Sequence, residues 1–171
     1  MSQKESALYW ADLGWGFSSN KSSTKDIGFN LQNGNMLYTI QISKTDSSGS
    51  FLGTPKREKS FILVGALLGV ATQDTNWHAS VSGGITYVRR ISITNIFAHT
   101  GEIFPPKVGE TKEVASAVGV TILAQLFFNK GSGMCRNCGK HLGMGIELFI
   151  TANELETISG FTLNVMFGKL R

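Results

Sequence analysis

The sequence predicts an all-β protein, a single domain over residues 1–171 folded as an eight-stranded antiparallel up-and-down transmembrane β-barrel. Three observations predict this fold. Apolar and small polar residues alternate with a period of two along eight stretches of the chain. Long connections alternate with short ones. Charged residues make up only 16% of the sequence, against about 25% in ordinary soluble domains, so either the surface is unusually apolar or the interior is unusually large.

The first part of the chain predicts a three-stranded antiparallel sheet. Leu13 and Trp15 share one face of the first strand, whereas Asp12 lies on the other. Asn33 and Gly34 separate the second strand from the third, and this pair suits a two-residue hairpin turn because both turn positions need positive φ angles. The three strands are expected over residues 9–17, 27–31 and 35–43.

Five further strands complete the predicted barrel. Residues 60–72 are apolar on both faces, so the alternation does not show which face points inward. Residues 112–127 also allow a helix, but their Val, Thr and Ile content and an internal glycine favour a strand. Most strands have about the 9 to 11 residues that cross a bilayer when tilted. The five strands are expected over residues 60–72, 77–92, 118–128, 143–153 and 160–168.

The connections differ between the two ends of the predicted barrel. Those after the first, third and fifth strands have about eight, sixteen and twenty residues, whereas those after the second and fourth have two and about four. Long loops at one end and tight turns at the other are typical of bacterial outer-membrane barrels. We therefore expect the N-terminus and the tight turns at the periplasmic end.

The two faces of the strands indicate which face meets lipid. One face carries small neutral polar residues, which suit a packed lumen. The other face carries Leu, Ile, Val and Phe, with aromatic residues at its ends as in membrane-interface girdles. A soluble, lipocalin-like barrel with an apolar, ligand-binding lumen is the alternative, but its exterior would need charges on nearly every strand. The aromatic residues of the apolar face are Tyr9, Trp15, Tyr38, Trp77, Tyr87 and Phe167.

On these dyad repeats and loop lengths, the chain resembles the small eight-stranded outer-membrane barrel proteins of Gram-negative bacteria over essentially its whole length. The resemblance implies the bacterial outer membrane, with a signal peptide removed, and outer-membrane lipids and other envelope proteins as partners. It implies a non-enzymatic structural or accessory subunit of an envelope protein complex, without a cofactor. The last strand in that family usually ends on an aromatic residue, whereas Phe167 lies four residues before the end here.

Three charged residues fall on the predicted lumen face, namely Asp12, Arg90 and Glu147. We expect the two acids to pair with Arg90 in a buried ion network that plugs the lumen, because buried charges are costly unless they are paired. A gated pore and an acid pair with a perturbed pKa remain the alternatives.

Residues 93–113 form the longest expected outer loop. Ile96, Phe97, Ile103 and Phe104 make it too apolar for a freely hydrated segment. We expect it to pack over the barrel mouth as a lid or to dock against another protein.

The two cysteines, Cys135 and Cys138, lie between the sixth and seventh strands, at the expected periplasmic end. That compartment is oxidising, so a disulfide that braces the turn is favoured over free thiols. His141 would supply a third zinc ligand, but a fourth is missing from the same connection, and no metal is expected.

Other chemistry is weakly indicated. His78 and Ser80 share one strand face and suggest a lipid acyl hydrolase or transferase, but they fall at the periplasmic end, whereas such enzymes act on the outer leaflet. His99 has no recognisable partner, and no G-x-S-x-G motif occurs. The net charge of +4 is not gathered into a stripe, which argues against nucleic acid as a partner.

Overall fold

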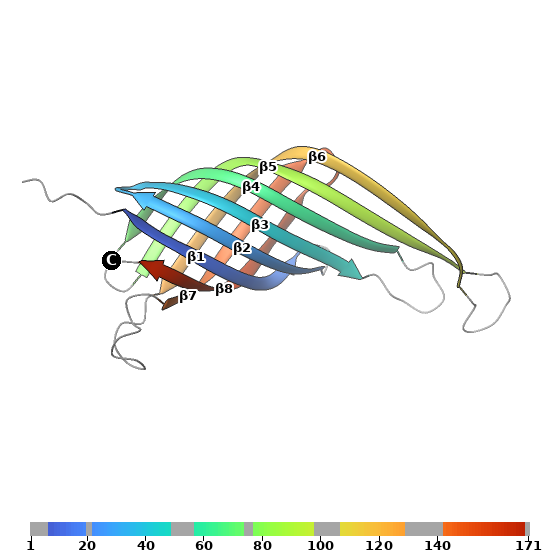
Figure 1. Ribbon diagram of the computed structural model, residues 1–171, viewed down its shortest axis with the longest axis horizontal. Helices are drawn as coiled ribbons and strands as arrows, with labels where there is room; N and C mark the ends of the chain where they lie inside the picture. The colour runs from blue at the N-terminus through green and yellow to red at the C-terminus, as the bar shows by residue number, and fades with distance from the viewer. Residues whose placement is uncertain are drawn as a thin grey trace, which may run out of the picture.

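The protein, seen in a computed structural model, is a closed eight-stranded antiparallel β-barrel (Figure 1). The structure describes residues 7–19, 22–48, 57–73, 77–97, 107–128 and 142–169. Each strand pairs with the next along the chain, and β8 pairs with β1 to close the sheet. Among the residues that the structure describes, none forms a helix long and apolar enough to span a membrane. The strands are β1 (Leu8–Ser18), β2 (Ser22–Asn33), β3 (Met36–Ser48), β4 (Arg57–Gln73), β5 (Trp77–Phe97), β6 (Lys107–Phe128), β7 (Leu142–Asn153) and β8 (Ile158–Lys169).

The alternation of the sequence matches the two faces of the barrel wall. In β1, Leu13 and Trp15 point outward and are 49% and 62% exposed, whereas Asp12 points inward and is fully buried. The segment that suited a helix is part of β6. In β4, which was apolar on both faces, Leu63 and Leu67 point into the lumen. The predicted fold class is therefore confirmed.

The hairpin between β2 and β3 turns one residue later than predicted. Asn33 still pairs with Met36, so Gly34 and Asn35 are the two turn residues. Gly34 has a φ of 58°, in the left-handed region that glycine adopts without steric cost. The side-chain amide of Gln32 donates to the Gly34 carbonyl oxygen at 2.7 Å, which holds the turn.

The two ends of the barrel differ in the lengths of their strands and not in the lengths of their loops. This corrects the prediction of long loops at one end and tight turns at the other. We call the end with the 34–35 turn and both described chain ends the base, and the opposite end the mouth. Only residues 19–21 join β1 to β2, and residues 98–106 join β5 to β6, whereas the base connection 129–141 is longer than either. Most of the expected outer loops are strand, because their backbones pair with a neighbouring strand.

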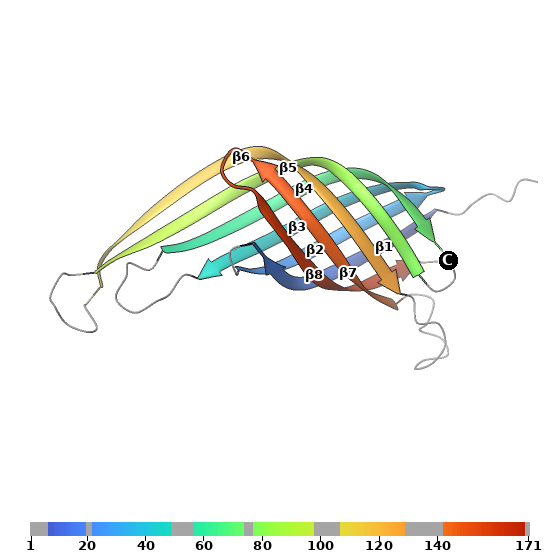
Figure 2. The ribbon, with the colours of Figure 1, turned by 180° about the vertical axis from the view of Figure 1, so that it is seen from behind.

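An extension of the wall, formed by the outer parts of β5 and β6, is the most conspicuous feature at the mouth. β5 and β6 remain paired out to Phe97 and Lys107, with a register shift near the tip. β7 pairs with β6 only from Gly119 to Phe128, and Figure 2 shows β7 and β8 ending well short of the tips of β5 and β6. We call residues 88–97 and 107–117 the projecting hairpin. It forms one side of the mouth, with the first half of β4 along its other edge.

The lumen is filled by two apolar clusters with polar residues between them. Gln125, on the lumen face of β6, separates Leu123 of one cluster from Phe127 of the other. The cluster toward the mouth consists of Phe61, Leu63, Leu67, Val88, Leu123, Phe149 and Ile158. The cluster toward the base consists of Trp10, Leu37, Ala71, Phe127 and Met166, with Leu8 packed against it.

The exterior of the closed part of the barrel is an apolar belt. Large aliphatic side chains such as Ile85, Ile122 and Leu163 are more than half exposed on it. An exposed apolar surface of this extent fits a lipid environment and does not fit water. The predicted girdle residues Tyr9, Trp15, Tyr38, Trp77, Tyr87 and Phe167 all lie on this exterior face.

A charge placed on the belt should destabilise the barrel in lipid. We expect Ile122→Arg to lower the free energy of unfolding in phosphatidylcholine vesicles by about 2–4 kcal/mol, the cost of arginine near a bilayer midplane. Denaturant titration followed by tryptophan fluorescence measures the change.

The matched control is Val114→Arg, on the same strand and the same face but on the projecting hairpin. We expect a change within about 0.5 kcal/mol for this exposed site. Equal losses in the two variants would contradict a belt that meets lipid at Ile122 and water at Val114.

Candidate functional site

Three carboxylates from separate strands meet in the lumen. Asp12 comes from β1, Asp26 from β2 and Glu147 from β7, and one oxygen of each lies within 4.8 Å of the others. Asp12 and Glu147 have no exposed surface, and Asp26 is 4% exposed. We call these residues the three-acid cluster.

Two glycines make room for the aspartates. In the ladder between β1 and β2, Asp12 lies opposite Gly28 and Asp26 lies opposite Gly14. A Cβ atom at Gly28 would lie 2.6 Å from both carboxylate oxygens of Asp12, and one at Gly14 would lie 2.2 Å from Oδ1 of Asp26. Any larger residue at either glycine would therefore displace a carboxylate.

Asn164 of β8 lies at the centre of the three-acid cluster. Its Nδ2 is 3.2 Å from Oδ1 of Asp12, 3.1 Å from Oδ2 of Asp26 and 3.4 Å from Oε2 of Glu147. Its Oδ1 accepts a hydrogen bond from the Thr162 hydroxyl at 2.6 Å. One amide group thus contacts all three carboxylates.

The remaining donors to Glu147 are also amides. Gln41 donates to its Oε1 at 2.6 Å, and Gln125 donates to its Oε2 at 2.9 Å. The Ser80 hydroxyl donates to Oε1 of Gln125 at 3.0 Å and so orients that amide.

Asp12 has a similar chain of donors. Asn30 donates to its Oδ2 at 2.6 Å and accepts a hydrogen bond from Thr39 at 2.7 Å. Neutral donors therefore surround both of the predicted lumen acids.

Arg90 does not join the acids, which corrects the predicted ion network. Ser80 of β5 contacts the cluster through Gln125, and Arg90 lies ten residues beyond Ser80 on the same strand. At about 3.3 Å per residue, this separation is roughly 33 Å. In the part of the chain that the structure describes, no lysine or arginine lies within ion-pair distance of the three acids. Arg90 was predicted to meet the acids because it occupies a lumen-facing position in the two-residue repeat of its strand. Its position along the strand instead puts it near the mouth.

Asp26 is the acid that sequence reasoning missed. It occupies the lumen face of β2, two residues before Gly28, so the alternation continues through it. The strand was expected to begin at Ile27, one residue too late. Extending the alternation backward would have found it.

His78 and Ser80 do not form a catalytic pair. The His78 ring packs edge-on against Trp10 with centroids 4.7 Å apart, and its Nε2 lies 3.2 Å from Oε1 of Gln32. Ser80 donates to Gln125 instead. The histidine is 2% exposed, so it is packed within the lumen near the base.

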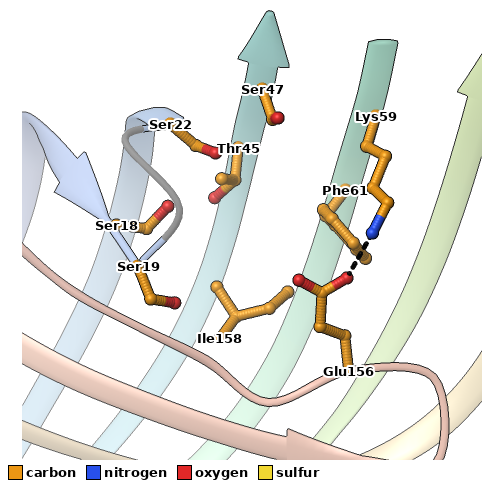
Figure 3. A pocket seen from close by; sticks show the side chains of 9 residues that line it. All are labelled: Ser18, Ser19, Ser22, Thr45, Ser47, Lys59, Phe61, Glu156 and Ile158. Carbon is orange, nitrogen blue, oxygen red and sulfur yellow. Dashed lines mark hydrogen bonds and ion pairs between the residues drawn. The ribbon is translucent and has the colours of Figure 1, made fainter. Parts of the chain in front are cut away.

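A small polar pocket opens at the mouth (Figure 3). Its volume is about 300 Å³, and hydroxyls of Ser18, Ser22 and Thr45 line one wall. Lys59 of β4 closes the other side through an ion pair of 3.0 Å with Glu156 in the turn between β7 and β8.

Several predicted residues lie outside the described part of the chain. Cys135, Cys138 and His141 fall in residues 129–141, and Ile103, Phe104 and His99 fall in residues 98–106. The backbones of Ile96 and Phe97 end β5. Residues 93–97 and 107–113 are strand, so the expectation that all of residues 93–113 form a loop is wrong.

Comparison with solved structures shows the same fold in bacterial outer-membrane proteins. No protein-family model and no curated protein sequence matches the chain. Ail, the attachment invasion locus protein of Yersinia pestis, is similar with a TM-score of 0.59, 8% identity and coverage of 95% of this chain and 96% of Ail. The N-terminal β-barrel domain of Pseudomonas aeruginosa OprF is similar with a TM-score of 0.53 and 11% identity, and the match covers 97% of this chain and 99% of that domain. Neisserial surface protein A is similar with a TM-score of 0.50 and 10% identity, and the match covers 94% of this chain and 96% of that protein. The chain therefore has the fold of small outer-membrane barrels.

Removing the Asn164 amide should weaken the barrel. With a chelator present, we expect Asn164→Leu to lower the free energy of unfolding in detergent micelles by about 1.5–3 kcal/mol, because a buried carboxylate loses a charge-assisted hydrogen bond. Urea titration followed by tryptophan fluorescence measures this loss.

Met166→Leu is the control, since Met166 is a buried lumen residue two positions along the same strand. A volume-conserving apolar change there should cost less than about 1.5 kcal/mol. Equal stability of Asn164→Leu and the wild type would show that the amide does not offset the acidic charges.

Proposed function

We propose that the protein is a non-enzymatic integral outer-membrane β-barrel that acts as a structural or accessory subunit of an envelope protein complex. The projecting hairpin is the surface that contacts the partner protein, and the apolar belt contacts membrane lipid. The observation that carries the proposal is the combination of a filled lumen with a wall that extends past the rest of the mouth.

The filled lumen argues against transport. The side chains of the two apolar clusters and of the polar residues between them are at most 8% exposed. An eight-stranded barrel is just wide enough for side chains to fill it, so little space remains for a solute. The protein's contacts therefore lie on its exterior.

The lumen also offers no reactive group of the expected kind. Ser80 and His78 hydrogen-bond to two different glutamines instead of to each other. Their position near the base argues against chemistry on outer-leaflet lipid. A soluble ligand-binding barrel is disfavoured as well, because the lumen is polar around Asp12 and Glu147 and the exterior is apolar.

The projecting hairpin has the properties of a contact surface. Val114 is 51% exposed on it, and the neighbouring residues 110–113 are exposed on both faces of the strand. β7 stops pairing with β6 at Gly119, so the outer part of β6 is the edge of the sheet. Sheet edges are common templates for pairing with another chain.

Site-specific photo-crosslinking in cells tests the proposal. A benzophenone amino acid at Val114 should yield a discrete protein adduct after irradiation, because the side chain points away from the barrel in water. The same amino acid at Ile122, on the same face of β6 but in the belt, should yield none with that partner.

Heat-modifiable migration of the chain from the outer-membrane fraction verifies that both variants are folded there. The proposal is wrong if the chain folds in that fraction, purifies alone in mild detergent, and gives no adduct from positions 112, 114 and 116.

A further inference from the structure

We propose that the three-acid cluster is a binding site for one calcium ion inside the barrel. The proposal is independent of the protein's partner. It rests on the uncompensated charge of the cluster, its spacing, an unsatisfied carboxylate oxygen and the polar residues that lead to it.

The first argument is charge. Asp12, Asp26 and Glu147 are carboxylates from three strands, all at least 96% buried. Among the described residues only neutral groups donate to them, and no lysine or arginine is within ion-pair distance. Buried charges in proteins are paired or coordinate metal ions. A bound cation would supply the charge that Arg90 does not.

The second argument is spacing. One oxygen from each acid lies within 4.8 Å of the others. Two ligands on opposite sides of a calcium ion are about 4.8 Å apart, since each lies about 2.4 Å from it. Magnesium needs a tighter cage at about 2.0–2.1 Å, and zinc prefers nitrogen and sulfur ligands. The three oxygens are no farther apart than opposite ligands of one calcium ion, so this all-oxygen set can hold calcium.

The third argument is an oxygen without a partner. Oδ1 of Asp26 is buried and accepts no hydrogen bond from the described residues. Asp26 as a whole is only 4% exposed. A buried carboxylate oxygen with no donor is costly. Coordination of a cation at the cluster would satisfy it.

Asn164 can become a further ligand by rotating its side-chain amide. Its Nδ2 now faces the three acids and its Oδ1 faces Thr162. A half-turn of the amide exchanges the two atoms, and the Thr162 hydroxyl can accept a hydrogen bond as well as donate one. Asn164 would then present an oxygen to the ion, and water molecules would complete the six to eight ligands that calcium takes.

The fourth argument is the polar face that leads from the mouth to the cluster. Ser22 lines the mouth pocket, and Thr24 and Asp26 follow it at alternate positions on the lumen face of β2. Asp26 is also the one acid of the three that keeps any exposed surface. The lumen face of β2 is therefore polar from the mouth pocket to Asp26, and this is the side from which an ion would enter.

Calcium-dependent stability of the refolded chain of residues 1–171 in zwitterionic micelles tests the site. At a calcium concentration a hundred times its Kd, the ratio of folded to unfolded protein should rise about a hundredfold over the ratio in EDTA. Urea titration with CaCl₂, MgCl₂ or EDTA measures this ratio, and equilibrium dialysis of the wild type should give one calcium ion per chain. Magnesium should have a much smaller effect.

Asp26→Asn should remain folded, because it removes an uncompensated charge, and should lose the calcium response. Asp46→Asn is the matched control, since Asp46 is an exposed aspartate near the mouth that pairs with Lys44. It should keep the full response. Asn164→Asp adds a fourth carboxylate, so its stability should depend more steeply on calcium than that of the wild type.

Three results would overturn the site. The first is no calcium bound to the wild type in dialysis, which does not depend on any variant folding. The second is a response in Asp26→Asn equal to that of the wild type. The third is an equal response to calcium and magnesium.

Discussion

Closure of the sheet is the constraint on which the rest of this structure depends. In lipid no water can satisfy a backbone amide or carbonyl, so a membrane-crossing sheet must leave no edge within the bilayer. Pairing of β1 with β8 from Tyr9↔Lys169 to Ser18↔Gly160 meets this requirement. A closed wall has one face toward lipid and one toward the lumen, and the period-two pattern follows from that geometry.

The lumen then has to satisfy its own polar groups. Neutral amides from Gln41, Gln125 and Asn164 do this for carboxylates that no arginine of the described residues reaches. The apolar clusters on either side remove water from the same region. A polar network in such surroundings stabilises one arrangement of strands only if each member has a partner. Among the carboxylate oxygens of the three acids, Oδ1 of Asp26 is the one without a hydrogen-bond partner in the described residues, which is a reason to assign an ion there.

The two ends of the wall differ in how their strands are supported. Within the closed barrel, each strand has two neighbours, and burial of the lumen side chains supports the fold. Beyond Gly119 toward the mouth, the described part of β6 pairs with β5 on one edge only, and its residues 110–114 are exposed on both faces of the strand. The side chains that fill the lumen and the exposed residues 110–114 of β6 are therefore different residues.

The sequence by itself determined the fold class, the number of strands and the face of most side chains. These are local properties, because alternation between Leu13 and Asp12 needs only the two-residue repeat of a strand. It could not orient β4, whose two faces are both apolar since Leu63 and Leu67 pack in the lumen. Nor could it show that residues 107–113 are strand, because residues 110–113 are exposed on both faces and so carry no alternation.

Only the tertiary structure decided which lumen residues meet. Face parity placed Asp12, Arg90 and Glu147 together, but depth in a barrel depends on register between strands and on their tilt. Register brings Asp12 and Glu147 beside Asp26 and leaves Arg90 near the mouth. It is set by backbone pairing among segments more than a hundred residues apart, as between β1 and β8, and no local pattern carries that information.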